Sequence, residues 1–316
     1  MTFDLAGRRV WIAGHRGMVG SALVRRLQRE PVTLLTIDRA ELDLRRQADV
    51  EAWVAANKPE VIVIAAAKVG GIKANDAYPV DFLYDNLAIH TNILRAAAEH
   101  GVARVMVLGS SCVYPKLAEQ PIREATLLTA PLEPTNQWYA LAKIAAMKLA
   151  ESYRRQHGRD FITVVPTNLY GPGDNFDLEQ GHVISALMRK IHEAKQAGRD
   201  SVEIWGTGAP KREFVFVDDA ADGLVFLLRH YADGAPINLA GGEEVSIREL
   251  ATLLAEIIGY GGRFDYLTDR PDGMPRKLLD ASRVAALGWR PTTGLRAGLT
   301  ATYHWFVSTG GAGNRV

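Results

Sequence analysis

The sequence predicts an α/β protein: a Rossmann-type doubly wound parallel sheet, followed by a smaller C-terminal α/β lobe. Two observations predict this fold. Apolar strand patterns alternate with helical patterns over the first half of the 316 residues, and a glycine-rich turn joins the first strand to the first helix. A hydrophobic content of 47% is ample for one large core or two unequal lobes.

Composition excludes several classes of protein. A net charge of +1 indicates neither a nucleic-acid partner nor a membrane surface. No apolar run approaches the roughly 18 residues of a transmembrane helix, and residues 1–9 contain Asp4 and lead into a strand, so we expect no signal peptide. The single cysteine, Cys112, excludes an internal disulfide, and the eight histidines show no metal-ligand spacing. We therefore expect a cytoplasmic, metal-free protein.

The first strand, 10–13, runs into a turn whose residues are Gly14, His15, Arg16, Gly17, Met18, Val19 and Gly20. Three glycines at three-residue spacing, between a strand and a helix, let the backbone approach a pyrophosphate, and the helix N-terminus favours its charge. The spacing G-x-x-G-x-x-G is the version found in short-chain dehydrogenases. We predict a dinucleotide-binding turn.

The second strand, 32–37, ends in Asp38 and Arg39, and these residues give conflicting signals about the cofactor. An acidic residue at this place usually accepts hydrogen bonds from the ribose hydroxyls and selects NAD. Arginines instead accommodate the 2′-phosphate of NADP, and both Arg16 and Arg39 are available. We favour NADP(H), and a clear kinetic preference for NADH would contradict this prediction.

The fourth strand, 105–108, ends in Gly109, Ser110, Ser111 and Cys112, after a third strand at 61–67, a turn at 68–71 and a long helix at 81–100. Active-site residues of open α/β sheets collect at such strand ends. In the helix expected at 137–157, Tyr139 and Lys143 lie one turn apart on one face. An ammonium beside a phenol favours the phenolate, which suits the phenol to proton transfer.

The second half of the chain carries a proline-containing loop at 113–134 and a strand at 161–165. The run 166–173 follows, where we expect a nicotinamide, and a helix then begins at His182. A strand at 214–217 precedes a helix capped by Asp218 and Asp219, and residues 237–239 return to the main sheet. The charged loop 269–277 is either a solvated surface or, with Arg212, a diphosphate clamp, and we favour the clamp. Residues 246–249 form a capping box.

These elements divide the chain into two lobes. We expect a dinucleotide-binding domain at 1–170, with later returns near 214–240. Residues 171–213 and 241–307 would form the substrate-binding lobe, and the glycine-rich residues 308–316 a disordered tail.

Motifs along most of the chain, from about 10 to 306, resemble those of the GDP-L-fucose synthase family, which belongs to the extended short-chain dehydrogenases. The motifs lie at 14–21, 68–72, 108–116, 132–136, 166–171, 212–214 and 271–280. The resemblance implies NADPH-dependent conversion of GDP-4-keto-6-deoxy-D-mannose to GDP-L-fucose, by epimerisation at C3 and C5 and reduction of the C4 ketone.

The resemblance also implies roles for individual residues. Cys112 and His182 match the base and acid of the epimerisation. Ser110 and Tyr139 would hydrogen-bond the C4 oxygen, which Tyr139 then protonates, while Lys143 orients the ribose. Because a free thiol has a pKa of about 8.5, Cys112 needs positive charge nearby to act as a base.

Cofactor contacts are expected at the glycine turn, at the ends of three strands and on two helices. They are Gly14, His15, Arg16, Gly17, Met18, Val19, Gly20, Asp38, Arg39 and on to 44, Leu108, Gly109, Ser110, Ser111, Lys143, Pro166, Thr167, Asn168, Leu169 and His182. Contacts with the GDP-sugar are expected at Lys190, Trp205, Arg212 and Asp272. The family is typically a homodimer joined through a four-helix bundle, for which the helices at 81–100 and 137–157 are the candidates.

Three departures from the family pattern leave alternatives open. Asp38 stands where a neutral residue is common, Lys190 replaces an arginine and its bidentate fork, and Gln137-Trp138 stand where a smaller residue or proline is usual. A reductase or epimerase acting on another GDP-linked deoxy or heptose sugar is therefore the alternative enzyme. A cofactor-sensing binding protein is the alternative from another class, and the presence of Ser110, Tyr139 and Lys143 together argues against it.

Overall fold

Six parallel strands form the central sheet of the computed structural model, which describes residues 2–270 and 272–310. Their order is β2 (Thr33–Leu35), β1 (Arg9–Ala13), β3 (Val61–Ile64), β4 (Arg104–Leu108), β5 (Phe161–Pro166) and β9 (Ile237–Leu239). The chain moves outward from β1 on both sides, so the strand order reverses between β1 and β3, where open α/β sheets bind ligands. The predicted doubly wound sheet is confirmed.

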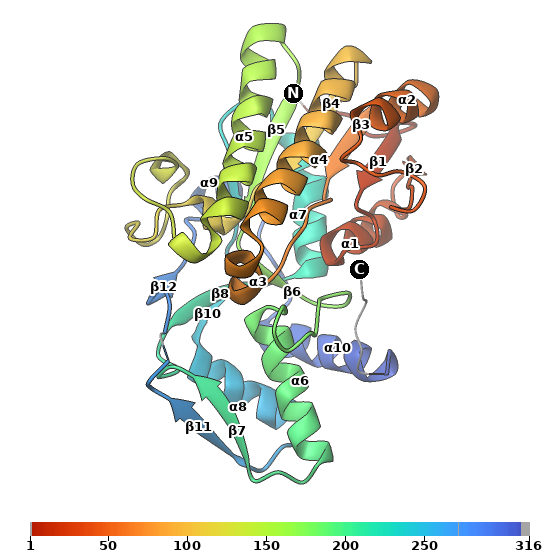
Figure 1. The fold of residues 1–316 in the computed structure, drawn as a ribbon. Coiled ribbons are helices and arrows are strands. Elements are labelled where there is room, and N and C mark those ends of the chain that lie inside the picture. The colour runs from red at the N-terminus through yellow and green to blue at the C-terminus, as the bar shows by residue number, and fades with distance from the viewer. Residues whose placement is uncertain (1, 271, 311–316) are drawn as a thin grey trace.

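Helices cover both faces of this sheet (Figure 1). On one face lie α1 (Met18–Leu27) and α7 (Val217–His230), and on the other α2 (Gln47–Asn57), α4 (Pro79–Glu99) and α5 (Gln137–His157). Successive side chains of β1 point to opposite faces of the sheet and so contribute to both cores. Val10 and Ile12 pack with the first pair of helices, while Trp11 and Ala13 pack with the other three.

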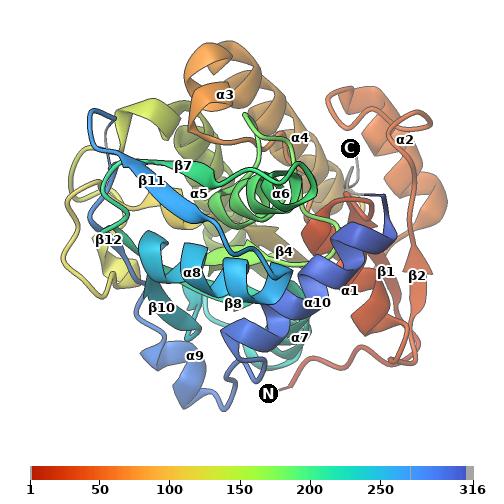
Figure 2. The same cartoon turned by 90° about the horizontal axis from the view of Figure 1, so that it is seen from below.

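A smaller lobe holds a four-stranded sheet and three helices. The sheet joins β6 (Asn168–Tyr170), β8 (Lys211–Phe216), β10 (Glu243–Ser246) and β12 (Arg276–Lys277), and a parallel pair joins β7 (Ser201–Trp205) to β11 (Arg263–Leu267). The helices α6 (Val183–Gln196), α8 (Ile247–Ile258) and α10 (Leu295–Ser308) pack around Phe176 and Met188. Figures 1 and 2 show these helices beyond one end of the central strands.

Short helices make up much of the remaining structure: α3 (Ile72–Ala77), η1 (Ser111–Val113), η2 (Glu124–Thr126), η3 (Pro134–Asn136) and α9 (Ser282–Ala286). The segment predicted as a loop at 113–134 therefore contains helical turns. None of the helices in the described part of the chain combines the length and apolar character needed to cross a membrane.

Several local predictions differ from the structure. The strand predicted at 214–217 is β8, which begins three residues earlier and belongs to the smaller sheet. Asp218 and Asp219 do not cap α7, because Phe216 occupies the N-cap; Asp219 instead accepts hydrogen bonds from the backbone N–H groups of Thr292 and Thr293. The capping box at Ser246 and Glu249 is confirmed. Of the predicted tail, residue 308 lies in α10 and residues 311–316 lie outside the described range.

Candidate active site

The glycine turn between β1 and α1 is closed by contacts that only glycine permits. Gly14 has φ +88°, and a Cβ there would lie 2.6 Å from Ala66 Cα; a Cβ on Gly20 would lie 2.0 Å from Gly14 O. At Gly17 a Cβ would meet only Gly14 O, at 3.5 Å, so packing within the chain does not require glycine there. The turn thus leaves the N-terminus of α1 open to an anion such as a pyrophosphate.

Asp38 lies beside the glycine turn and holds two of its side chains. Its carboxylate is 3.0 Å from Arg16 Nε and 3.3 Å from His15 Nε2. Arg39 is exposed. The two opposing signals read from the sequence therefore meet in one ion pair, between the carboxylate that would bind a ribose and the guanidinium that would bind a 2′-phosphate.

The end of β4 and the first turns of α5 bring Ser110, Cys112, Tyr139 and Lys143 together. The Ser110 side chain accepts a hydrogen bond from Cys112 N at 3.5 Å, as the cap of η1. Burial raises the pKa of the Cys112 thiol, and Lys277, a hydrogen bond with Ser110, and Lys143 oppose that increase. The cysteine thus has the nearby positive charge that a thiolate base requires.

The Lys143 ammonium lies over the ring of Tyr139. It is 5.7 Å from the centre of that ring and donates to Leu108 O at 2.9 Å. Burial, and then the charge of Cys112, raise the pKa of Tyr139, while burial lowers the pKa of Lys143 to about 8. Burial and the charge of Cys112 therefore both favour the protonated phenol over the phenolate.

His182 occupies the N-cap position of α6. Its Nδ1 lies 3.6 Å from Asp174 Oδ1, and the hydrogen bond with Asp174 raises the imidazole pKa despite the opposing effect of burial. Gly71 N donates to Gln180 O at 2.8 Å, which ties the turn at 68–71 to the segment before His182. Among the described residues, no hydrogen bond or ion pair joins His182 to Ser110, Cys112, Tyr139 or Lys143.

The predicted sugar-binding residues come from the smaller lobe. Arg212 pairs in register with Lys277 across β8 and β12, and burial lowers the pKa of its guanidinium. The Asp272 carboxylate accepts from Thr207 N at 2.7 Å and from Thr207 Oγ1 at 2.8 Å. Trp205 exposes 48% of its surface, and Lys190 lies half-buried on α6. Asp272 therefore shapes the turn after β7 in this structure.

The predicted nicotinamide-side segment bridges the two lobes. Pro166 ends β5, and Thr167 N donates to Leu239 O at 3.1 Å. Asn168 Nδ2 donates to Glu213 O at 2.9 Å and belongs to β6. Within the part of the chain that is described, no cluster of three or more His, Cys, Asp or Glu side chains could hold a metal ion.

Sequence reasoning missed three residues that support this site. Lys277 lies in the charged loop 269–277, for which a diphosphate clamp is predicted, yet its charge acts on Cys112. Glu213 is fully buried and accepts backbone N–H groups from Gly241 at 2.6 Å and Gly242 at 3.1 Å. His90 is fully buried in α4 and contacts Lys143. His90 shares the apolar face of its helix with Phe82 and Ile93, which indicates that the imidazole is buried but not that it contacts Lys143.

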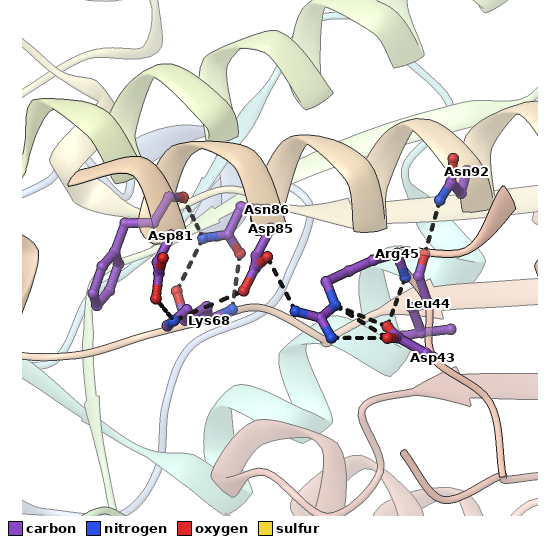
Figure 3. A network of polar contacts seen from close by, with 9 residues as sticks. Asp43, Leu44, Arg45, Lys68, Asp81, Asp85, Asn86 and Asn92 are labelled. Carbon is purple, nitrogen blue, oxygen red and sulfur yellow. Dashed lines mark hydrogen bonds and ion pairs between the residues drawn. The ribbon is translucent and has the colours of Figure 1, made fainter. Parts of the chain in front are cut away.

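A network of charged and amide side chains holds the turn at 68–71 and the segment after β2 against α4 (Figure 3). Lys68 forms ion pairs with Asp81 and Asp85, and Asp85 accepts from Arg45 at 3.3 Å. A hydrogen bond from Arg45 lowers the pKa of Asp43 to about 2. The turn that follows β3 and the segment that follows β2 are therefore anchored to the same helix.

The sequence is similar to proteins of one enzyme family over most of its length. The model of the NAD dependent epimerase/dehydratase family matches residues 10–240. GDP-L-fucose synthase 1 of Arabidopsis thaliana is 55% identical over 300 residues, which cover 95% of this chain and 93% of the plant protein.

Two solved structures are similar over almost the whole chain. A GDP-6-OMe-4-keto-L-xylo-heptose reductase from C. jejuni has a TM-score of 0.90 and 32% identity, covering 98% of this chain and 100% of the other. A GDP-L-fucose synthetase from Naegleria fowleri, bound to NADP, has a TM-score of 0.90 and 27% identity, covering 98% and 97%.

Proposed function

The chain belongs to the NAD dependent epimerase/dehydratase family, and we propose that it is an NADP-dependent enzyme that converts GDP-4-keto-6-deoxy-D-mannose to GDP-L-fucose. The observation that carries this proposal is the meeting of Ser110, Cys112, Tyr139 and Lys143 at the end of β4. The relatives named above act on GDP-sugars by their names, and one was solved with NADP bound.

The residues of the glycine turn fit a dinucleotide. Gly14 and Gly20 close the turn without side chains, and Arg16 and Arg39 supply cations for a 2′-phosphate. Bound NADPH supplies the hydride that reduces the C4 ketone. Lys143 orients the ribose next to Tyr139.

Epimerisation needs a base on one face of the sugar and an acid on the other, because the C4 ketone acidifies the hydrogens at C3 and C5. Cys112 removes the proton as a thiolate supported by Lys277 and Lys143. His182, whose imidazole pKa is raised by the hydrogen bond with Asp174, returns a proton to the opposite face. Ser110 and Tyr139 hydrogen-bond the C4 oxygen as it gains negative charge.

Reduction then uses the same phenol as an acid. Tyr139 gives its proton to the C4 oxygen while hydride arrives at C4, and burial keeps that proton in place until it is needed. General acid–base help of this type contributes about 10²- to 10⁴-fold to a rate. In this assignment Arg212, with Lys190, Trp205 and Asp272, holds the GDP moiety.

A related GDP-linked heptose or deoxy sugar is the second candidate substrate. Gln137 and Trp138 lie beside Tyr139 at the start of α5, and the likeness to a heptose reductase extends over the whole chain.

The test incubates purified protein with GDP-4-keto-6-deoxy-D-mannose and either NADPH or NADH, and identifies the product by NMR. We expect GDP-L-fucose and one NADPH oxidised per sugar, with Tyr139→Phe as the control that loses reduction. Oxidation of NADPH only with a GDP-heptose would favour the second candidate. No oxidation with any 4-keto GDP-sugar would contradict both.

The assembly is a further part of the proposal. The helices α4 and α5 lie side by side. Val80 and Tyr84 on α4 are 73% and 64% exposed, and Leu141 on α5 is 40% exposed. A second copy packing the same two helices would form a four-helix bundle and cover these side chains. Light scattering of Tyr84→Glu tests this, since a dimer should become a monomer.

Two more assignments complete the proposal. Residues 1–170 and 214–240 carry the dinucleotide, and 171–213 with 241–307 carry the sugar nucleotide. A single, buried thiol suits the reducing cytoplasm, and the net charge of +1 favours neither nucleic acid nor membrane as a partner.

A further inference from the structure

A buried histidine on α4 contacts the lysine of the active site. His90 is fully buried, and its Nε2 lies 3.2 Å from Lys143 Nζ. Its Nδ1 lies 2.7 Å from the backbone oxygen of Asn86, one helical turn earlier. The imidazole thus spans from the backbone of its own helix to the only ammonium in the described cluster of Ser110, Cys112, Tyr139 and Lys143.

The tautomer of His90 follows from its two neighbours. The Asn86 carbonyl can only accept, so Nδ1 carries the hydrogen and Nε2 presents its lone pair to Lys143. Burial, and then the charge of Lys143, lower the pKa of His90 to about 3. The imidazole is therefore a neutral acceptor near neutral pH.

The ammonium of Lys143 has three hydrogens, and two of them are assigned by the structure. One goes to Leu108 O at 2.9 Å, and one goes to His90 Nε2 at 3.2 Å. Because the ammonium is tetrahedral, fixing two N–H bonds fixes the direction of the third. The other titratable groups near this ammonium are Cys112 of η1 and Tyr139 of α5.

We propose that His90 is a positioning residue, which fixes the direction of the Lys143 ammonium so that its third hydrogen is free for a ribose hydroxyl of the cofactor. This inference rests on the proposed function only in assigning the ribose as the partner of Lys143. The contacts of Asn86 extend the arrangement: its side-chain amide donates to Lys68 O at 3.0 Å and accepts from Lys68 N at 2.9 Å. One turn of α4 therefore places both the lysine and the turn at 68–71.

Two polar substitutions separate the two hydrogen bonds of His90. In His90→Gln the amide oxygen occupies the place of Nε2 and can accept from Lys143, whereas the bond to Asn86 is lost. In His90→Asn the amide reaches only the place of Nδ1, so it can donate to Asn86 O but leaves Lys143 without this acceptor. His100→Gln, at the exposed C-cap of the same helix, is the matched control.

The first measurement is the Kd of NADPH alone, by titration calorimetry, which needs no sugar and so does not depend on the identity of the substrate. We expect His90→Asn to weaken NADPH binding about tenfold, because the variant loses the hydrogen bond that orients the Lys143 ammonium, and a hydrogen bond to a charged group contributes about this much. His90→Gln should stay within about threefold of the unaltered protein, and His100→Gln should not change.

The second measurement is the pH dependence of kcat for reduction. The pKa of Lys143 is about 8, and loss of an acceptor lowers it further because the charged form loses a hydrogen bond. The alkaline limb of the profile should therefore move to lower pH in His90→Asn and stay in place in His90→Gln. Equal effects of the two variants, or a larger effect of Gln, at equal Tm would overturn the proposal and indicate a packing role. Absence of turnover with any sugar would count against the proposed function alone, because the NADPH titration would still decide the role of His90.

Discussion

Replacing Asp38 with asparagine should strengthen the preference for NADPH over NADH. The carboxylate of Asp38 faces two ways in the structure: it pairs with Arg16 at 3.0 Å, and it lies at the strand end where ribose hydroxyls bind. Asp38→Asn removes the negative charge but keeps the size of the side chain. Arg16 is then released toward a 2′-phosphate, and the ribose of NADH loses its charged acceptor.

The expected magnitude follows from these two effects. Arg16 is 71% exposed and Asp38 32% exposed, so the existing pair contributes no more than about 1 kcal/mol, and freeing the arginine favours NADPH by up to that amount. Losing a charged hydrogen bond to the ribose disfavours NADH by about 1.5 kcal/mol. The sum, roughly 1.5 to 2.5 kcal/mol, corresponds to an increase of about 10- to 60-fold in the ratio of kcat/KM for NADPH to that for NADH.

The assay measures kcat/KM for both cofactors at one ionic strength, since exposed charges are screened by salt. Asp49→Asn is the matched control, because Asp49 forms an ion pair of the same kind with Arg46, at 2.7 Å, on α2. A ratio that changes by less than twofold in Asp38→Asn, or that changes equally in the control, would refute the role assigned to Asp38.

Three further predictions address the proposed chemistry. Cys112→Ser should slow deuterium incorporation at C3 and C5 by about 10²- to 10⁴-fold while sparing hydride transfer to an epimerised sugar; equal loss of both steps would contradict this division. Lys277→Met should move the pH dependence of iodoacetamide alkylation of Cys112 to higher pH, because the lysine opposes the raised thiol pKa, and the single cysteine makes this readout specific. Asp174→Asn should lower the raised pKa of His182, so the alkaline limb of epimerisation should move to lower pH, and an unmoved limb would exclude His182 as the acid.

The fold was predictable because its signals are local. Each strand of the central sheet is a short apolar run, and each crossover contains a helix, so alternation along the chain predicts a doubly wound sheet. The predictions that failed depend on distant contacts. Nothing near Asp219 in the sequence indicates that its carboxylate holds Thr292 and Thr293, and residues 211–213 read as a polar segment until β10 and β12 pair with them.

The candidate site was predictable to the extent that its residues share one motif or one helix turn. Ser110 with Cys112, and Tyr139 with Lys143, are close in sequence, and the structure brings the two pairs together. Lys277 and His90 could not be added by spacing, because β12 and α4 meet the site only in the folded protein. The effect of Lys143 on Tyr139 stays a prediction, and burial, which also acts on the phenol, is a property of the whole fold that spacing does not show.

The distribution of cations in the site explains why one residue would act as base and another as acid. Burial alone raises the pKa of both Cys112 and Tyr139, which would keep both groups protonated. Lys277 and Lys143 oppose this effect at the thiol, whereas the charge of Cys112 adds to it at the phenol. Once the thiol ionises, its negative charge raises the pKa of the phenol, so the phenol keeps its proton. The phenol gives up that proton only when the reaction places negative charge on the oxygen that it contacts. A thiolate base that holds a neighbouring phenol in its protonated form is suited to epimerisation first and protonation of the reduced oxygen afterwards, which is the order that the proposed reaction requires.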